Sequence, residues 1–137
     1  MFELNPVLDS DTITVVEWPL SLVLLSLDAN YPWCILVPRR AGIREIYELD
    51  SADQQQLLRE SSALGETMMA LFQGDKLNVA ALGNMVPQLH LHHIVRYEGD
   101  EAWPGPVWGV VEKLEYSEEL LHERVEALRD ALADVAV

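Results

Sequence analysis

Two apolar runs on either side of a turn constrain the fold more than any other feature of this chain. "LSLVLLSL" (residues 20–27) predicts a largely buried strand, and "WCILV" (33–37) predicts a strand buried on both faces. Between them lies "DANYP", in which Asn30 and Pro32 favour a tight turn. The two runs are therefore expected to pair as a hairpin.

Three further strands and a long helix are expected elsewhere. The strands are "TITVVEW" at residues 12–18, "KLNVAAL" at residues 76–82 and a fifth strand from Gln88 to Tyr97. Apolar residues at helical spacing predict the helix at about residues 51–73.

Both ends of the long helix carry signals, and a second helix follows near the C-terminus. Ser51 and Gln54 form a predicted capping box, and Gly74 supplies the predicted stop. The C-terminal helix is expected at about residues 117–135, on an apolar stripe made of Leu121, Val125, Leu128 and Leu132.

The order of these elements indicates the fold class. Strands and helices do not alternate regularly, which favours an α+β fold with a five-stranded, mainly antiparallel sheet. At 137 residues the chain is long enough for one domain with its own core. The main domain is expected to span residues 1–112, with residues 113–137 as an acidic C-terminal helical extension packed on it.

The charge balance limits the partners. Nine basic against 23 acidic residues give a formal net charge of −14, which disfavours binding to a nucleic-acid polymer. The longest nearly apolar run, residues 19–27, is too short to cross a bilayer, and the N-terminus lacks the basic segment of a secretory signal. A cytoplasmic protein without a membrane partner is therefore expected.

Three of the four histidines lie in "QLHLHHIVRY", residues 88–97. In a strand, Gln88, His90 and His92 point to one face at a pitch of about 6.6 Å, while His93 points to the other. Two imidazoles and an amide on one face can contact one small anion together. This row is the candidate site.

Three interpretations of the row remain open. The histidines can be structural, satisfying buried hydrogen bonds. They can bind a metal, although a third ligand is absent from that strand face and only His122 or Cys34 could approach it through the tertiary fold. They can also act covalently: one neutral imidazole attacks phosphorus, the second binds or protonates phosphate oxygens, and backbone N–H groups of "GNMVP" hold the anion.

The sequence around the row resembles the histidine triad (HIT) superfamily. "NVAALGNMVPQLHLHHIVR" is similar to its signature of an asparagine-bearing strand, a Gly-Gln turn and H-x-H-x-H-x-x, with Gly83 and Asn84 in the place of Gly-Gln. "LVLLSLDANYPWCILVPRRAG" is similar to its strand, aspartate, turn and strand ending in Val-Pro. The resemblance covers roughly residues 10–110.

The resemblance implies a HIT-like fold and a set of roles. His90 would attack the α-phosphate of a purine nucleotide conjugate and become nucleotidylated, and His92 would contact phosphate oxygens. Asn78 would hydrogen-bond the site, and Asp28 would hold the ribose hydroxyls. The implied protein is a homodimer that hydrolyses nucleoside phosphoramidates or dinucleoside polyphosphates, with no cofactor and no obligatory metal.

Three positions depart from the family pattern. Gln88 replaces the first histidine, Trp33 replaces a supporting histidine, and Met85 replaces a hydroxyl residue that contacts phosphate. Each change removes a polar group, so two alternatives stay open: a nucleotide-binding module with weak or no catalysis, and a metal-dependent hydrolase. The "AWPGPVWG" loop either covers the pocket, forms the dimer contact or simply packs Trp103 and Trp108 on the core.

Overall fold

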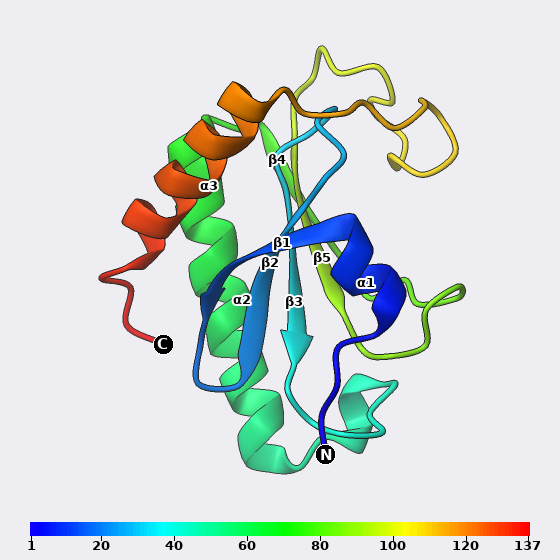
Figure 1. Ribbon diagram of the computed structural model, residues 1–137, viewed down its shortest axis with the longest axis vertical. Helices are drawn as coiled ribbons and strands as arrows, with labels where there is room; N and C mark the ends of the chain where they lie inside the picture. Colours follow the sequence, from blue (N-terminus) through cyan, green and yellow to red (C-terminus); the bar gives the residue numbers. More distant parts are fainter.

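The computed structural model describes residues 1–137, which form a five-stranded antiparallel sheet flanked by helices (Figure 1). The elements in chain order are α1 (Pro6–Asp11), β1 (Thr12–Glu17), β2 (Ser21–Ser26), β3 (Trp33–Pro38), the 3₁₀ turn η1 (Ile46–Glu48), α2 (Ser51–Phe72), β4 (Lys76–Ala80), β5 (Leu91–Arg96) and α3 (Glu118–Leu132). The predicted α+β class and five-stranded antiparallel sheet are confirmed. None of the helices combines the length and the apolar character needed to span a membrane.

The strand order is β1-β2-β3-β5-β4, so the last strand in the chain lies inside the sheet. The predicted hairpin is present: β2 and β3 pair across the turn, with Leu25 opposite Cys34. β5 pairs with β3 on one side and with β4 on the other. The histidine-bearing strand is therefore held by hydrogen bonds along both edges, and β4 is left as an edge strand.

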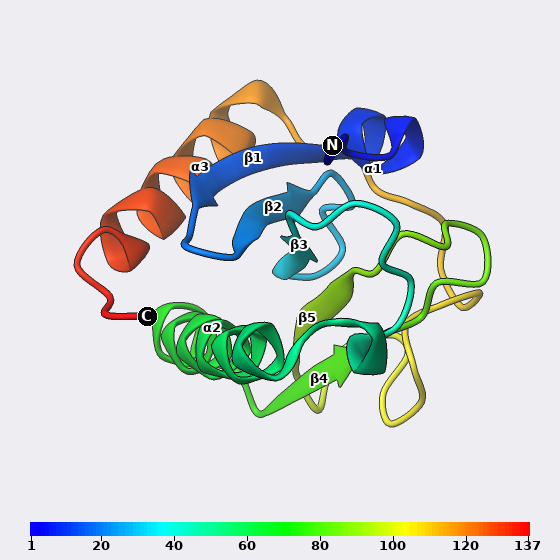
Figure 2. The same cartoon turned by 90° about the horizontal axis from the view of Figure 1, so that it is seen from below.

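The sheet is covered on both faces, which explains the uninterrupted apolar runs (Figure 2). On one face α2 and α3 pack against a core that includes Val23, Leu25 and Leu36. The other face carries α1 and a second core that includes Leu24 and Ile35. Alternate side chains of β2 and β3 thus enter two different cores, so the central positions of both strands are apolar on both faces.

β5 begins at Leu91, so the expected strand from Gln88 was too long at its start. Pro87 has no N–H to donate to a sheet ladder. The Leu89 N–H donates to the Ile43 carbonyl at 3.0 Å and not to β4. Residues 88–90 therefore approach the sheet as an irregular segment. α3 is likewise shorter than expected, ending at Leu132.

The N-terminal cap of α2 lies one residue earlier than predicted. Asp50 is the N-cap, and its carboxylate accepts a hydrogen bond from the Asp53 N–H at 2.8 Å. Ser51 is already the first helical residue, so the Ser51–Gln54 capping box is wrong. An ionised carboxylate at this place also interacts favourably with the positive end of the helix dipole.

The C-terminal cap of α2 is Gln73 in the left-handed conformation (φ 53°), one residue before the predicted stop at Gly74. Gly74 serves a different purpose. A Cβ atom there would overlap Cγ1 of the buried Val95 and would lie 2.9 Å from Sδ of Met69. The glycine therefore allows α2 to meet β5 closely.

Gly74→Ala is accordingly expected to destabilise the protein by about 1–3 kcal/mol, because the added methyl overpacks this contact. The free energy of unfolding from urea titration measures the effect. Gly99→Ala is the matched control, since a Cβ at Gly99 meets nothing within 4 Å. Equal stability of the two variants would contradict the packing argument.

Candidate active site

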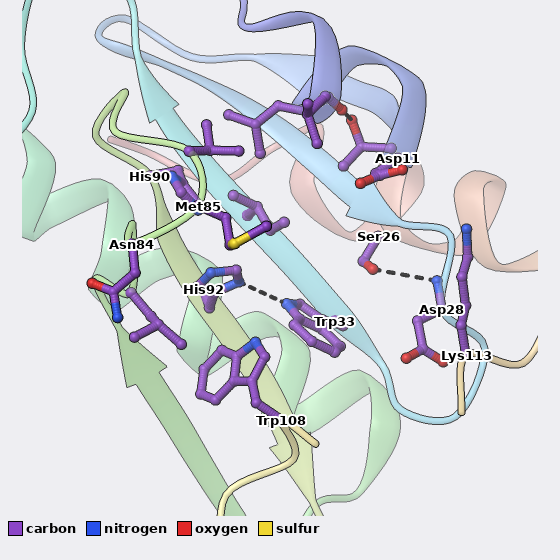
Figure 3. A pocket seen from close by; sticks show the side chains of 16 residues that line it. Asp11, Ser26, Asp28, Trp33, Asn84, Met85, His90, His92, Trp108 and Lys113 are labelled. Carbon is purple, nitrogen blue, oxygen red and sulfur yellow. Dashed lines mark hydrogen bonds between the residues drawn. The ribbon is translucent and has the colours of Figure 1, made fainter. Parts of the chain in front are cut away.

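A cavity of about 560 Å³ opens on the sheet face opposite α2 and α3 (Figure 3). Its apolar walls include Leu8 of α1, Ile35 of β3 and Val86 of the loop after β4. The labelled polar and aromatic side chains of the cavity are Asp11, Ser26, Asp28, Trp33, Asn84, His90, His92, Trp108 and Lys113. The volume lies within the usual range for small-molecule sites.

His90 and His92 meet at one end of this cavity. Their ring centroids are 4.9 Å apart, with an angle of 73° between the planes, and both residues are buried. Nδ1 of His90 lies 2.7 Å from the Gln88 carbonyl oxygen. Because a carbonyl can only accept, Nδ1 carries the proton, and Nε2 of a neutral His90 keeps its lone pair.

His92 is held by an aromatic neighbour. Nε1–H of Trp33 donates to Nδ1 of His92 at 3.0 Å, and the two rings lie edge to face. Burial lowers the pKa of His92 to about 4, and the nearby His90 adds to this shift. His92 is therefore neutral at physiological pH.

His93 takes no part in the cavity, as strand alternation predicted. It points towards α2, where its Nε2 accepts a hydrogen bond from the Ser61 hydroxyl at 2.7 Å and its Nδ1–H donates to the Leu91 carbonyl at 3.1 Å. Burial lowers the pKa of His93 to about 4. Its contacts are those of a structural residue.

The Gln88 side chain does not join the two imidazoles. Its Oε1 accepts from the Asn5 N–H at 2.9 Å, and its Nε2–H donates to the Glu3 carbonyl at 2.8 Å. Both ends of the amide thus hold the N-terminal segment. Gln88 reaches the site only through its backbone carbonyl, which orients His90.

Asn78 is also engaged elsewhere. It lies on β4 opposite Ile94, and its Oδ1 accepts from Nη1 of Arg96 at 2.8 Å. Arg96 is 1% exposed and forms a two-pronged ion pair with Asp100. The structure therefore brings Asn78 together with a buried arginine and not with the cavity residues.

Asn84, Met85 and Asp28 do line the cavity. Asn84 and Met85 come from the loop after β4, and Met85 is almost fully exposed. Asp28 follows β2 at the other end, where its Oδ1 accepts from the Asn30 backbone N–H at 3.0 Å and side-chain Nδ2–H at 2.7 Å. Its Oδ2 has no such partner within the chain.

Three parts of the cavity wall were not predicted from the sequence. Trp108 of the "AWPGPVWG" loop stands edge to face with both His92 and Trp33, at centroid distances of 5.1 and 5.9 Å. Lys113 reaches the rim from the segment before α3, and sequence patterning offers no signal for this. α1 could have been found, because Asn5 followed by Pro6 is a typical helix start.

The metal interpretation finds no third ligand. The structure contains no group of three or more His, Cys, Asp or Glu side chains placed to hold an ion. Cys34 is fully buried in the core beneath α2 and α3, where burial raises its thiol pKa to about 12. His122 is on α3, on the other face of the sheet from α1 (Figure 2), and it does not line the cavity.

Comparisons with known proteins agree with this architecture. The chain matches the family model described as HIT domain over residues 7–99. A crystal structure of a histidine triad protein from Marinobacter aquaeolei VT8 is similar at 59% identity and a TM-score of 0.95, covering 99% of both chains. A search of curated protein sequences gives no match.

Two further solved structures are similar over nearly the whole chain. A histidine triad protein from Bradyrhizobium japonicum is 47% identical, with a TM-score of 0.93, and the match covers 95% of this chain and 97% of that one. One from Sinorhizobium meliloti 1021 is 38% identical, with the same TM-score, over 96% and 98%. The chain belongs to the histidine triad (HIT) family.

Proposed function

We propose that this protein is a nucleotide hydrolase or transferase acting at the α-phosphate of a purine nucleotide conjugate, with His90 as the nucleophile. One observation carries the proposal: the only proton of a neutral His90 is committed to the Gln88 carbonyl, which leaves Nε2 free beside the cavity. A neutral imidazole with an accessible lone pair is a competent nucleophile near neutral pH. Family membership supports the same role.

The proposed reaction has two displacements. Nε2 of His90 forms a bond to the α-phosphorus, and the bond to the leaving group breaks with its electron pair going to the leaving atom. Water then attacks the same phosphorus and releases a proton to the solvent, the P–N bond breaks with its pair returning to Nε2, and the nucleoside monophosphate departs. His92 donates to a phosphate oxygen, and Oδ2 of Asp28 accepts from the ribose hydroxyls.

A homodimer is part of the proposal. β4 is an edge strand whose outer N–H and C=O groups can pair with a second copy, and Val79 on it is half exposed. Asn84 and Met85, which line the cavity, follow directly in the chain. Such pairing would extend the sheet across two copies.

A nucleotide-binding module without efficient catalysis is the second candidate. It is favoured by the amides of Gln88 and Asn78, which bond to the N-terminal segment and to Arg96 and leave fewer polar groups for a phosphate. Met85 offers no hydroxyl either. This candidate predicts calorimetric binding of AMP with negligible turnover.

The pure protein is expected to release AMP from an AMP phosphoramidate or from a diadenosine polyphosphate, with the same rate in EDTA. His92→Ala is expected to retain an acid-labile AMP on His90 when radiolabelled substrate is quenched and the protein is digested. A rate abolished by EDTA and restored by zinc would favour a metal-dependent hydrolase. AMP binding without release from either substrate would favour the binding module.

A further inference from the structure

The hydrogen bond between Trp33 and His92 constrains where the proton of His92 can be. Trp33 on β3 and His92 on β5 lie on adjacent strands, and both side chains are at least nine-tenths buried. Nε1 of Trp33 is 3.0 Å from Nδ1 of His92. An indole N–H is a donor only, so Nδ1 must be the acceptor and cannot carry a proton.

We propose that Trp33 is a positioning residue that holds His92 as a neutral imidazole with its proton on Nε2, so that the site offers a hydrogen-bond donor and no imidazolium acid. Protonation of Nδ1 would set two N–H groups against each other across a buried contact. The neighbouring titratable groups are His90 in the cavity and His93 next in the chain. The charged groups that line the same cavity are Asp11, Asp28 and Lys113.

This arrangement has a consequence for the substrate class, which rests on the proposed function. When the bond to phosphorus breaks, the leaving atom keeps the electron pair. A phosphate or carboxylate departs as a stable anion, whereas an amine requires a proton as it leaves. Without an imidazolium at His92, the site favours nucleotide anhydrides, such as dinucleoside polyphosphates or acyl nucleotides, over phosphoramidates.

The tautomer is tested by nitrogen NMR on protein labelled with ¹⁵N in the histidine rings, which requires no turnover. At neutral pH the wild type is expected to show a pyridine-type Nδ1 and a pyrrole-type Nε2 for His92, assigned by the loss of these signals in His92→Gln. Trp33→Phe keeps an aromatic ring and removes the donor. It is expected to mix the two tautomers and to raise the titration midpoint of His92.

Trp103→Phe is the matched control, because Trp103 packs near Arg96 and does not line the cavity. Its His92 signals are expected to equal those of the wild type. A pyrrole-type Nδ1 in the wild type, or a Trp33→Phe spectrum identical to the wild type, overturns the proposal. Thermal unfolding of each variant confirms that it is folded before the spectra are compared.

The leaving-group consequence is measured separately by kcat/KM. The wild type is expected to prefer an AMP anhydride over an AMP alkylamidate by about 10²-fold. This is the lower end of the rate enhancement that a general acid typically contributes. Trp33→His should narrow this ratio, because an imidazole in place of the indole can accept as well as donate and so permits a protonated His92. Equal rates on both substrates in the wild type overturn the substrate preference. Absence of turnover on both would contradict the proposed function, while the NMR result still decides the tautomer.

Discussion

His90→Ala is expected to reduce AMP release by about 10⁴- to 10⁶-fold, the loss seen when a covalent nucleophile is removed from a hydrolase. No other imidazole can substitute for it. His92 keeps its Nδ1 against Trp33, and His93 lies on the opposite face of the sheet. The rate of AMP release at saturating substrate measures the effect.

His122→Ala is the matched control for a histidine substitution. His122 is exposed on α3 and is not among the residues that line the cavity. Its activity is expected to equal that of the wild type. Equal activity of His90→Ala and wild type would remove His90 from the mechanism, and AMP binding by His90→Ala would show that the cavity itself is intact.

Asp100→Ala is expected to lower the free energy of unfolding by about 3–5 kcal/mol, because it leaves the buried Arg96 without its counter-charge. The carboxylate of Asp100 accepts from Nε and Nη2 of Arg96, both at 2.9 Å. It also accepts from the backbone N–H groups of Tyr97 at 3.1 Å and Trp103 at 2.8 Å. One substitution therefore leaves the buried guanidinium of Arg96 and these two backbone N–H groups without the carboxylate that accepts from them.

Urea titrations of Asp100→Ala and of Glu126→Ala provide the comparison. Glu126 pairs with Arg129 at 3.4 Å on the surface, with both side chains about half exposed, and such a pair contributes at most about 1 kcal/mol. A loss below that value in Asp100→Ala would show that Arg96 finds other partners. Combining it with Arg96→Met should recover part of the stability, since no uncompensated charge then remains.

The ion pair between Arg96 and Asp100 also makes the free energy of unfolding depend on pH. The hydrogen bond from Arg96 holds the pKa of Asp100 below its usual range, so the folded state binds this proton less readily than the unfolded state. The contribution is fully present above the ordinary aspartate pKa of about 4 and is lost as the pH falls through the lower folded value. The stability gap between wild type and Asp100→Ala should therefore narrow in acid.

Periodicity along the chain was sufficient to predict the sheet, the two main helices and the opposite orientations of His92 and His93. These properties depend on near neighbours: the apolar runs of β2 (residues 22–25) and β3 require cover on both faces, and alternation in β5 places His92 and His93 on opposite faces. The cap positions were wrong by one residue at each end of α2, because several polar residues stand there side by side and only backbone geometry distinguishes them.

The partners of the polar side chains depended on contacts between distant segments. Gln88, in the place of the first histidine, and Asn78 were both expected at the site, yet the Gln88 side chain bonds to residues 3 and 5 and that of Asn78 to Arg96. In the sequence, Trp33 indicates the loss of a supporting histidine. In the structure, its indole N–H donates to His92, which is 59 residues away in sequence and on the adjacent strand. Trp108 reaches the same ring from a loop without periodicity.

The sequence by itself therefore determined the fold class and the face of the sheet on which His92 lies, because strand alternation and apolar patterning are local properties. Only the tertiary structure decided that His90, in the irregular segment before β5, meets His92, and where the proton of each imidazole lies. Each proton depends on a partner within about 3 Å of a ring nitrogen: for His90 the Gln88 carbonyl, which the irregular backbone before β5 turns towards the ring, and for His92 the indole of Trp33 on the adjacent strand.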